Sequence, residues 1–390
     1  MSPVQLGPDA TGLRTSRSRA WVVSSVENIP SAIRDTAFAD QCKDFRYYEV
    51  LERSLREQFV YRYLLLRDDS SGQWAVQPLF FVQQDLLAGL PRSLRSFSHV
   101  VRKYRPGFLK LRMMMLGCAA GEGQLDHSAQ WLVPALREAI EAYRVHAGAS
   151  IVLLKDFPST YRARLAKFSR DGFQRAPSMP AAKLELDFAT FEEFMSRRLS
   201  KVFRKNLRRK FRAAEKGPPI EMEVRSDTGD LVDELFALYW QTHRRSDFKF
   251  EELNKEYFRL IGQRMPDRVR YFIWRQAGRM IAFNLCMVHE NTLYDLNLGL
   301  DYSVAFDLHL YFVTWRDVIT WCLENGIKTY HTGPLNYEPK RHLKLTLLPY
   351  DLYARHNSSW LNPLFKLAIR FLEPTRHDRA LRRFSNADEI

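Results

Sequence analysis

The sequence carries a similar order of predicted elements twice, and this repeat constrains the fold more than any other feature. In the first half, two apolar, β-rich runs flank the polar turn Asp68–Gly72, a pattern typical of a hairpin. A third strand, a helix and a further strand follow. The predicted elements are a strand at Trp21–Ser24, a helix at Phe45–Leu55, strands at Tyr61–Arg67, Gln73–Val82 and Leu111–Leu116, a helix over 129–147, a strand at Ile151–Leu154 and a helix at Pro158–Phe168.

A related series follows Pro177 and Pro180, without obvious sequence identity to the first. It consists of a strand at Lys183–Phe188, a basic helix over 190–216, a helix at Asp230–Thr242, strands at Val269–Arg275, Met280–Val288 and Thr292–Leu298, a helix over 308–325, and strands at Ile327–Thr332 and Leu348–Ala354. Antiparallel strands joined to strand–helix–strand units predict an α/β protein with mixed sheets, built as two tandem modules. The expected divisions are a flexible tail over 1–19, modules over 20–180 and 181–356, and a C-terminal amphipathic segment and tail over 357–390.

The charge balance indicates an anionic partner. Among the 390 residues, Lys and Arg number 59 and Asp and Glu number 45, so the formal net charge is +14. The spacing of the four cysteines, Cys42, Cys118, Cys286 and Cys322, fits neither a zinc site nor a disulfide framework, and we expect no metal. The N-terminus lacks the apolar core of a signal peptide, and no apolar run approaches the ~20 residues that span a bilayer. We therefore expect a cytoplasmic protein.

Three segments of the second module resemble the GNAT acyltransferases, in the tandem form of the FemAB-like and cellulose-biosynthesis-type enzymes. These segments are Leu199–Arg212 (LSKVFRKNLRRKFR), Leu298–Phe312 (LGLDYSVAFDLHLYF) and Gly326–Leu345 (GIKTYHTGPLNYEPKRHLKL). The resemblance spans about 180–356, and over about 20–180 it rests on element order. It implies two GNAT-like modules that transfer an acyl group from a thioester such as acetyl-CoA, or from an aminoacyl-tRNA, to an amine.

A glycine loop after the third strand is the candidate phosphate site of the first module. Cys118–Gly123 (CAAGEG) matches the glycine part of the loop that cradles a pyrophosphate in single-domain relatives, so Gly121 and Gly123 are candidate cofactor-binding residues. However, Cys118 replaces the basic or amide residue of that pattern, and Glu122 adds negative charge. The alternative is a glycine-rich turn between a strand and a helix, which we favour.

Polar side chains on the predicted strand Thr292–Leu298 are candidate catalytic groups. Alternation predicts that Asp295 and Asn297 lie on one face. The other face then carries Tyr294, Leu296 and Leu298. Because a carboxylate in an inner strand is costly to bury, Asp295 either accepts a proton in the reaction or lines a wet cleft. We predict that backbone N–H groups around Asn297 bind the acyl thioester and donate hydrogen bonds to its oxyanion.

The segment that follows adds His331, Tyr337 and Lys340 to the predicted catalytic set. His331 is an alternative general base because imidazole titrates near neutral pH, although a lone histidine in a strand is more often structural. In Fem-type enzymes a lysine at a similar position approaches the donor carbonyl, so the resemblance implies that Lys340 stabilises charge in the transition state. A solvated surface lysine is the alternative for Lys340.

The predicted helix over 190–216 is strongly basic. Between Arg197 and Lys216 it carries ten Lys or Arg and one acid, Glu215. An apolar stripe lets one face pack and leaves the cations on the other. We favour anion binding over a solvated face, with Arg204 and Arg208 as candidate contacts for coenzyme phosphates, tRNA or a nucleotide-linked precursor.

The segment Trp360–Leu372 (WLNPLFKLAIRFL) is also amphipathic. We favour its packing against the second module over contact with a membrane surface. The combined prediction is an N-acyltransferase that passes an acyl group from acyl-CoA to an amine-bearing small molecule or envelope precursor, in envelope or polysaccharide biosynthesis. The alternatives are an aminoacyl-tRNA-dependent Fem-type peptidyltransferase acting on a peptidoglycan precursor, and a non-catalytic binding module. Which module binds the donor stays open.

Overall fold

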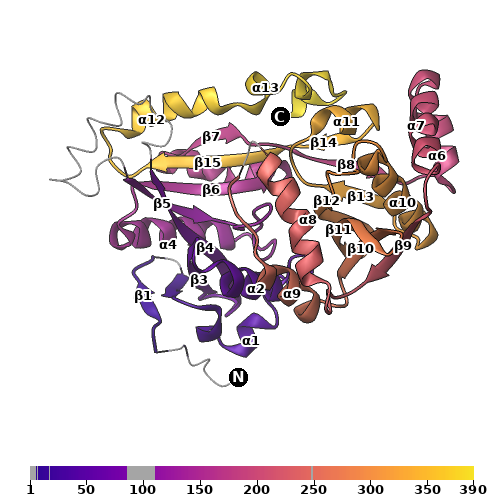
Figure 1. Ribbon diagram of the computed structural model, residues 1–390. Coiled ribbons are helices and arrows are strands. Elements are labelled where there is room, and N and C mark those ends of the chain that lie inside the picture. Colours follow the sequence, from indigo (N-terminus) through magenta and orange to yellow (C-terminus); the bar gives the residue numbers. More distant parts are fainter. Residues whose placement is uncertain (1–5, 7, 17, 86–109, 247–248) are drawn as a thin grey trace, which may run out of the picture. The chain divides into compact units, whose positions relative to one another are not determined.

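The chain forms two compact α/β units, each with its own mixed sheet (Figure 1). The computed structural model describes residue 6 and residues 8–16, 18–85, 110–246 and 249–390. Unit 1 consists of Met1–Ala39, Arg56–Ser178 and Tyr350–Arg376, and unit 2 of Asp40–Leu55, Met179–Pro349 and His377–Ile390. Each unit is therefore assembled from segments that are distant in the sequence.

Unit 1 contains an eight-stranded sheet in the order β1-β2-β3-β4-β5-β6-β15-β7. All neighbours pair antiparallel except β5 and β6, which are parallel and joined through α4. The elements are β1 (Thr11–Leu13), β2 (Ser18–Val23), α1 (Ser31–Arg34), β3 (Val60–Asp68), β4 (Trp74–Asp85), β5 (Lys110–Leu116), α4 (Leu132–Ala147), β6 (Ile151–Pro158), α5 (Arg162–Leu165), β7 (Gln174–Pro177), β15 (Tyr350–His356) and α12 (Asn362–Ile369).

Unit 2 contains a seven-stranded sheet in the order β14-β8-β13-β12-β11-β10-β9. Here β12 and β13 are the parallel pair, joined through α10, so the arrangement of β5, α4 and β6 recurs. The elements are α2 (Phe45–Leu55), β8 (Ala181–Glu185), α6 (Phe191–Arg198), α7 (Lys201–Ala214), β9 (Ile220–Arg225), α8 (Val232–Arg245), α9 (Lys255–Arg264), β10 (Val269–Gln276), β11 (Arg279–His289), β12 (Thr292–Leu300), α10 (Leu310–Glu324), β13 (Thr329–Thr332), α11 (Tyr337–His342) and β14 (Thr346–Leu348). The short α13 (Pro374–His377) follows α12.

The helices of unit 2 cover both faces of its sheet. The apolar sides of α6, α7 and α10 pack on one face, around residues that include Cys286, Leu293 and Tyr330. On the other face α8 and α9 pack against β10, β11 and β12. Gly299 allows this close approach, because a Cβ there would lie 2.9 Å from the backbone nitrogen of Tyr239 in α8.

The predicted strand Leu348–Ala354 is wrong as a single element. Pro349 separates β14 from β15, and the two strands belong to different sheets. A proline supplies no N–H to a ladder, which is why the chain leaves one sheet there. Strand β15 then lies between β6 and β7 and pairs antiparallel with both (Figure 1).

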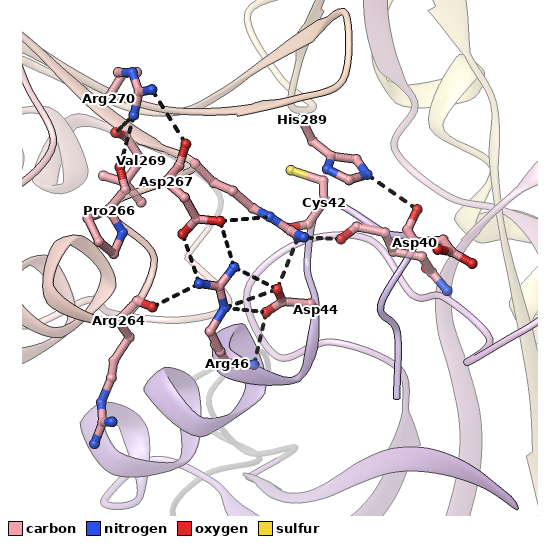
Figure 2. Close-up of polar contacts among 12 residues, drawn as sticks. Asp40, Cys42, Asp44, Arg46, Arg264, Pro266, Asp267, Val269, Arg270 and His289 are labelled. Atoms are coloured by element: carbon pink, nitrogen blue, oxygen red, sulfur yellow. Dashed lines mark hydrogen bonds and ion pairs between the residues drawn. The ribbon is translucent and has the colours of Figure 1, made fainter. Parts of the chain in front are cut away.

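The early segment Asp40–Leu55 belongs to unit 2, where α2 packs against α9. Its position is fixed by a polar network (Figure 2). The Arg46 guanidinium lies between two carboxylates, with Nη2 2.8 Å from Asp44 Oδ2 and Nη1 2.8 Å from Asp267 Oδ1. Arg268 also binds Asp44, at 3.2 Å, and donates to the carbonyl of Cys42 at 2.8 Å. Because this network joins α2 to the residues before β10, it holds an N-terminal helix in the second unit.

The predicted helix over 190–216 is wrong as a continuous helix. It consists of α6 and α7, which are separated at Leu199 and Ser200. Leu199 has extended backbone angles, and the Ser200 hydroxyl accepts a hydrogen bond from the N–H of Phe203, so Ser200 is the N-cap of α7. The predicted helix at Pro158–Phe168 is likewise broken into α5 between 3₁₀ turns over 159–161 and 166–171.

Two terminal segments also differ from expectation. Residues 11–13, predicted as part of a flexible tail, form β1 and pair with β2; residues 1–5, 7 and 17 of that tail lie outside the described residues. Helix α12, expected on the second module, packs on β7 and β15 of unit 1. The other predicted elements are confirmed with shifted ends, whereas β7, β9 and α9 and the short helices α1, α11 and α13 escaped prediction. The predicted α/β class with mixed sheets is confirmed.

Candidate active site

Strand β12 is an interior strand of the unit 2 sheet that nevertheless reaches solvent. Its neighbour β11 is buried from Met280 to Met287, but each residue from Tyr294 to Leu298 is partly exposed. The parallel pairing with β13 ends at Asp295, opposite Thr332, while β12 continues to Leu300. Beyond Asp295 the two strands therefore part, and an accessible length of β12 remains.

A β-bulge lies at this point of separation. Leu285 of β11 pairs with Asn297, but the next residue, Cys286, pairs with Asp295, so Leu296 is the extra residue. Because Leu285 and Cys286 point to opposite faces, Asp295 and Asn297 do so too. The prediction that Asp295 and Asn297 share a face is wrong. Asp295 lies on the α10 face with Cys286.

The edge of β12 that leaves β13 carries backbone donors. The N–H of Leu300 donates to the Thr242 hydroxyl of α8 at 3.1 Å, so it points away from β11. Donors of alternate residues point to the same edge, and the N–H of Leu298 is therefore directed to this edge as well. This places a backbone N–H beside the bulge, one residue beyond the predicted Asn297.

Asp295 lies in a polar cluster beneath this edge. The hydroxyl of Tyr330 on β13 donates to the carboxylate, and the Asn284 side chain of β11 makes a second hydrogen bond to it. Burial raises the pKa of Asp295, while these two hydrogen bonds and the charge of Lys340 act against the rise. The carboxyl is thus held in surroundings where taking up a proton costs less than it does in water.

Lys340 is the cation of the same cluster. Although lysine is usually exposed, Lys340 keeps only 6% of its surface accessible. Its Nζ donates to the carbonyl of Gly333 at 2.5 Å and lies 5.7 Å from the centre of the Tyr337 ring. Burial lowers the pKa of Lys340 to about 8, and the charge of Asp295 opposes this shift. The alternative of a solvated surface lysine is therefore wrong.

The other two predicted catalytic side chains, Tyr337 and His331, make different contacts. The Tyr337 hydroxyl donates to the Pro180 carbonyl at 2.8 Å, and its ring packs with Leu347 and Phe384. His331 pairs in register with Tyr294, one position before the Asp295–Thr332 pair, so it lies on the opposite face of the sheet from Asp295. The His331 and Tyr294 rings lie 5.1 Å apart.

Sequence reasoning missed one further member of the cluster, Tyr311 of α10. Burial and the negative charge of Asp295 raise the pKa of its hydroxyl, and its side chain is hydrogen-bonded to Asn336. Tyr311 lies near the start of α10, the helix that connects β12 to β13. Its position in the fold, rather than any motif, identifies it.

The basic face of α7 is arranged differently from the prediction. Arg204 Nη1 donates to the carbonyls of Ser196 at 2.8 Å and Leu199 at 3.3 Å, and Arg208 pairs with Glu192. Arg209 and Lys210, which were not among the predicted cofactor contacts, face the start of α10 instead. Lys210 Nζ lies 4.7 Å from the centre of the Phe312 ring.

The same two cations reach the residue before α10. Burial, followed by the charges of Lys210 and Arg209, lowers the pKa of His309, which immediately precedes the first turn of that helix. The N-terminus of α10 therefore meets two positive charges. This combination of a helix N-terminus and nearby cations favours an anionic group.

In unit 1, the glycine loop is closely packed. The N–H of Gly123 donates to the Asp156 carbonyl at 3.0 Å, and a Cβ at Gly123 would lie 2.4 Å from the Lys155 carbonyl oxygen. Lys155 Nζ donates to the carbonyl of Gly121 at 3.1 Å. Glycine at position 123 thus has a structural reason in the contact with β6, and phosphate binding by Gly121 and Gly123 stays a prediction.

Two properties of the described residues bear on cofactors and membranes. No group of three or more His, Cys, Asp or Glu among them is arranged to hold a metal ion. Within the same ranges, no helix combines the length and apolar character required to cross a bilayer.

Comparison with known proteins identifies the fold. Residues 201–341 match the acetyltransferase (GNAT) domain family, which confirms the predicted resemblance over this stretch. No curated protein sequence matches the chain.

Solved structures extend the likeness over most of the chain. L-PGS from Bacillus licheniformis is 13% identical with a TM-score of 0.51, and the match covers 85% of this chain and 97% of that one. The C-terminal domain of a putative lysylphosphatidylglycerol synthetase from Agrobacterium fabrum is 13% identical with a TM-score of 0.50, covering 86% and 92%. FemX is 12% identical with a TM-score of 0.53, covering 82% and 93%. These likenesses confirm the predicted tandem GNAT-like acyltransferase fold.

Proposed function

We propose that the protein is an N-acyltransferase that moves an acyl group from an acyl-CoA thioester to an amine, with the reaction centre in unit 2. The observation that carries this proposal is the bulged, accessible edge of β12 beside the partly exposed Asp295 and the buried Lys340. A thioester placed along that edge has a backbone donor, a carboxylate and an ammonium group within one cluster. Each of them matches a need of acyl transfer.

The reaction is a direct transfer. The amine nitrogen attacks the thioester carbonyl carbon, a C–N bond forms, and the carbonyl electrons move to oxygen. The N–H of Leu298 and the ammonium of Lys340 stabilise that oxyanion, since both are fixed before the charge develops. Asp295 accepts the amine proton through water. When the carbonyl reforms, the C–S bond breaks, and the departing thiolate takes up a proton relayed from Asp295 to give coenzyme A and the N-acyl product.

Asp295 is a better proton acceptor here than His331. The Asp295 carboxylate lies on the α10 face, where the charge of Lys340 acts on it. His331 lies on the opposite face of the sheet. One substrate at the bulge would therefore contact the Asp295 cluster rather than both groups. The phosphates of the donor are assigned to the N-terminus of α10 with Arg209 and Lys210, in place of Arg204 and Arg208.

The test combines binding and turnover. Acetyl-CoA and longer acyl-CoAs are titrated by calorimetry, and transfer to a panel of amines is followed by thiol release. The variant Lys340→Met should retain acyl-CoA binding and lose kcat/KM by roughly 100-fold or more, as expected when a group that stabilises the oxyanion is removed. Lys328→Met removes an exposed lysine of the same unit and should match the wild type. Unchanged kcat/KM in Lys340→Met would remove this residue from the mechanism.

An aminoacyl-tRNA donor is the second candidate. The exposed Lys201, Lys205 and Arg212 on α7 favour a polyanion, and the fold is shared with FemX and with a putative lysylphosphatidylglycerol synthetase. Charge reversal of these three residues should abolish co-purification of RNA if tRNA is the donor. Retained acyl-CoA turnover by that variant, with no RNA bound to the wild type, would leave the thioester as donor.

The acceptor is proposed to be an amine on a small molecule or on a precursor of the cell envelope. Its class can be separated from the donor question, because donor hydrolysis is measurable without an acceptor. A transfer rate that exceeds hydrolysis for one amine class identifies that class. Hydrolysis and transfer that are both absent across the panel would favour a binding module instead.

A further inference from the structure

The outer side of α12 and its continuation over 370–372 carries an apolar surface. Nine large hydrophobic side chains are exposed among the described residues, and five of these lie between Trp360 and Phe371. The exposed fractions are 89% for Trp360, 68% for Leu364, 56% for Leu367 and 59% for Phe371. The other four exposed side chains are scattered: Val60, Val145, Val202 and Phe306. A concentration of this kind marks an interaction site.

These side chains form one stripe. Trp360, Leu364, Leu367 and Phe371 are spaced four, three and four residues apart, which aligns them along a single face of a helix. The opposite face is already occupied, because Ile369 is buried against Ala176 of β7 and Ala354 of β15. The helix is therefore fixed to the sheet by one side and exposes a second apolar side.

The start of α12 is also anchored. Asn362 Nδ2 donates to the Gly172 carbonyl at 3.0 Å, and its Oδ1 accepts from the N–H of His356 at 2.9 Å. These bonds orient the helix on unit 1 independently of its outer face. The apolar stripe is thus presented on a helix that is already anchored to unit 1.

Charge selects the partner. Lys366 and Arg370 lie in the same segment as the stripe, and the guanidinium of Arg376 lies 5.4 Å from the centre of the Phe371 ring. The nearby acid, Glu373, is occupied by Arg376 at 3.2 Å and by the Thr375 hydroxyl at 2.5 Å. A second copy of this chain, with a net charge of +14, would bring further positive charge to this basic flank. An anionic lipid surface supplies the opposite charge together with an apolar layer.

We infer that this stripe, defined as Trp360, Leu361, Leu364, Leu367 and Phe371, is an interfacial membrane-binding surface for bilayers that contain anionic phospholipid. The helix lies in the plane of the interface with its stripe among the acyl chains near the headgroups. Trp360 lies at one end of the stripe, and an indole ring is well suited to the boundary between headgroups and acyl chains. Lys366 and Arg370 meet the lipid phosphates.

The test is co-sedimentation of the full chain with vesicles of equal parts phosphatidylglycerol and phosphatidylcholine, against vesicles of phosphatidylcholine alone. The wild type should bind the anionic vesicles, and added salt should weaken the binding without abolishing it. Leu364→Ser with Leu367→Ser should bind at least about tenfold more weakly. Val145→Ser with Val202→Ser is the matched control for two exposed apolar residues elsewhere, and should bind as the wild type does.

Two further measurements keep the outcomes separate. A blue shift of tryptophan emission on vesicle binding should disappear in Trp360→Phe, although seven other tryptophans remain among the eight. Both serine variants should keep the wild-type melting temperature, because the altered side chains are exposed. Equal vesicle binding by the Leu364→Ser/Leu367→Ser variant and the wild type would overturn the inference. So would self-association that this variant abolishes in the absence of lipid.

Discussion

Arg46 and Asp267, which are 221 residues apart in the chain, face each other in a two-pronged ion pair: Nη1 lies 2.8 Å from Oδ1 and Nη2 lies 2.9 Å from Oδ2. The same guanidinium binds Asp44 (Figure 2). These contacts raise the pKa of Arg46 and lower that of Asp267. The pair therefore joins the N-terminal segment Asp40–Leu55 to the sheet of unit 2 by charge as well as by packing.

Removal of this guanidinium should loosen α2. Arg46→Met is expected to lower the free energy of unfolding by about 1–2 kcal/mol, a range moderated by the partial exposure of the pair. Arg259→Met breaks an exposed pair with Glu256 on α9 and should cost less than about 0.5 kcal/mol. Urea unfolding measures both. Because the pKa of Asp267 is lowered, the contribution of the pair is present above the ordinary Asp range and is lost as pH falls below it.

The burial of Lys340 should make the free energy of unfolding depend on pH in the alkaline range. Its pKa is about 8 in the folded chain, against 10.5 for an unperturbed lysine, so between these values the unfolded chain holds more protons. The free energy of unfolding of the wild type, measured relative to Lys340→Met, should then rise with pH over this window, by up to about 3 kcal/mol. Lys328→Met, at an exposed position, should give a difference that stays flat. A flat difference for Lys340→Met as well would contradict the burial of the ammonium group.

The hydroxyl of Tyr330 tunes Asp295. Its hydrogen bond lowers the pKa of the carboxyl, so Tyr330→Phe should raise that pKa and move the acidic limb of kcat/KM to higher pH. The control is Tyr353→Phe, since Tyr353 is also a buried tyrosine but belongs to unit 1. It should leave the limb in place. If both variants retained the wild-type profile, Asp295 would not be the group that accepts the proton.

Arg209 and Lys210 should bind the donor phosphates. The double variant Arg209→Glu/Lys210→Glu is expected to weaken coenzyme A binding by about tenfold or more, because two attractions to phosphate become repulsions. Lys328→Glu with Lys344→Glu changes the net charge equally at exposed positions and is the control. Calorimetry at two salt concentrations measures the change. A similar loss in both variants would assign the effect to overall charge.

Substitution of Gly123 by a larger residue should destabilise the protein. Gly123→Ala places a methyl group 2.4 Å from the Lys155 carbonyl oxygen and should cost about 1–3 kcal/mol of stability. At Gly12, in the same unit, the nearest atoms to an added Cβ are 3.9 Å away, so Gly12→Ala should be nearly neutral. Thermal unfolding compares the two. A neutral Gly123→Ala would reopen a purely functional reason for this glycine.

Local patterns predicted much of the fold. The Phe45–Leu55 helix has the expected ends, and the hairpin of β3 and β4 forms around its polar turn. The break at Ser200, the N-cap of α7, was not predicted, because the continuous run of cations around it favoured a single helix. Local reasoning was sufficient where a residue and its neighbours in sequence determine the structure.

Features that depend on distant pairing were not predictable in this way. The bulge at Leu296 exists only in the register of β12 against β11, and it reversed the relation between Asp295 and Asn297. Lys340 was found through a resemblance, because nothing in its own sequence distinguishes a buried lysine from an exposed one. Tyr311 and Lys210 enter the site through the packing of α10 and α7, which no single-sequence pattern specifies.

The exchange of segments between the units has a consequence for synthesis on the ribosome. When residue 178 has been made, the sheet of unit 1 still lacks β15, which separates β6 from β7 and ends at His356. At this stage α2 has been made, but the other segments of unit 2, which begin at residue 179, have not. Neither half can therefore complete its fold as it emerges, and the edge of β6 stays open until nearly the whole chain has been translated. We therefore expect nascent chains to need protection of this edge during that interval, while each unit of the finished molecule contains segments from both ends of the chain.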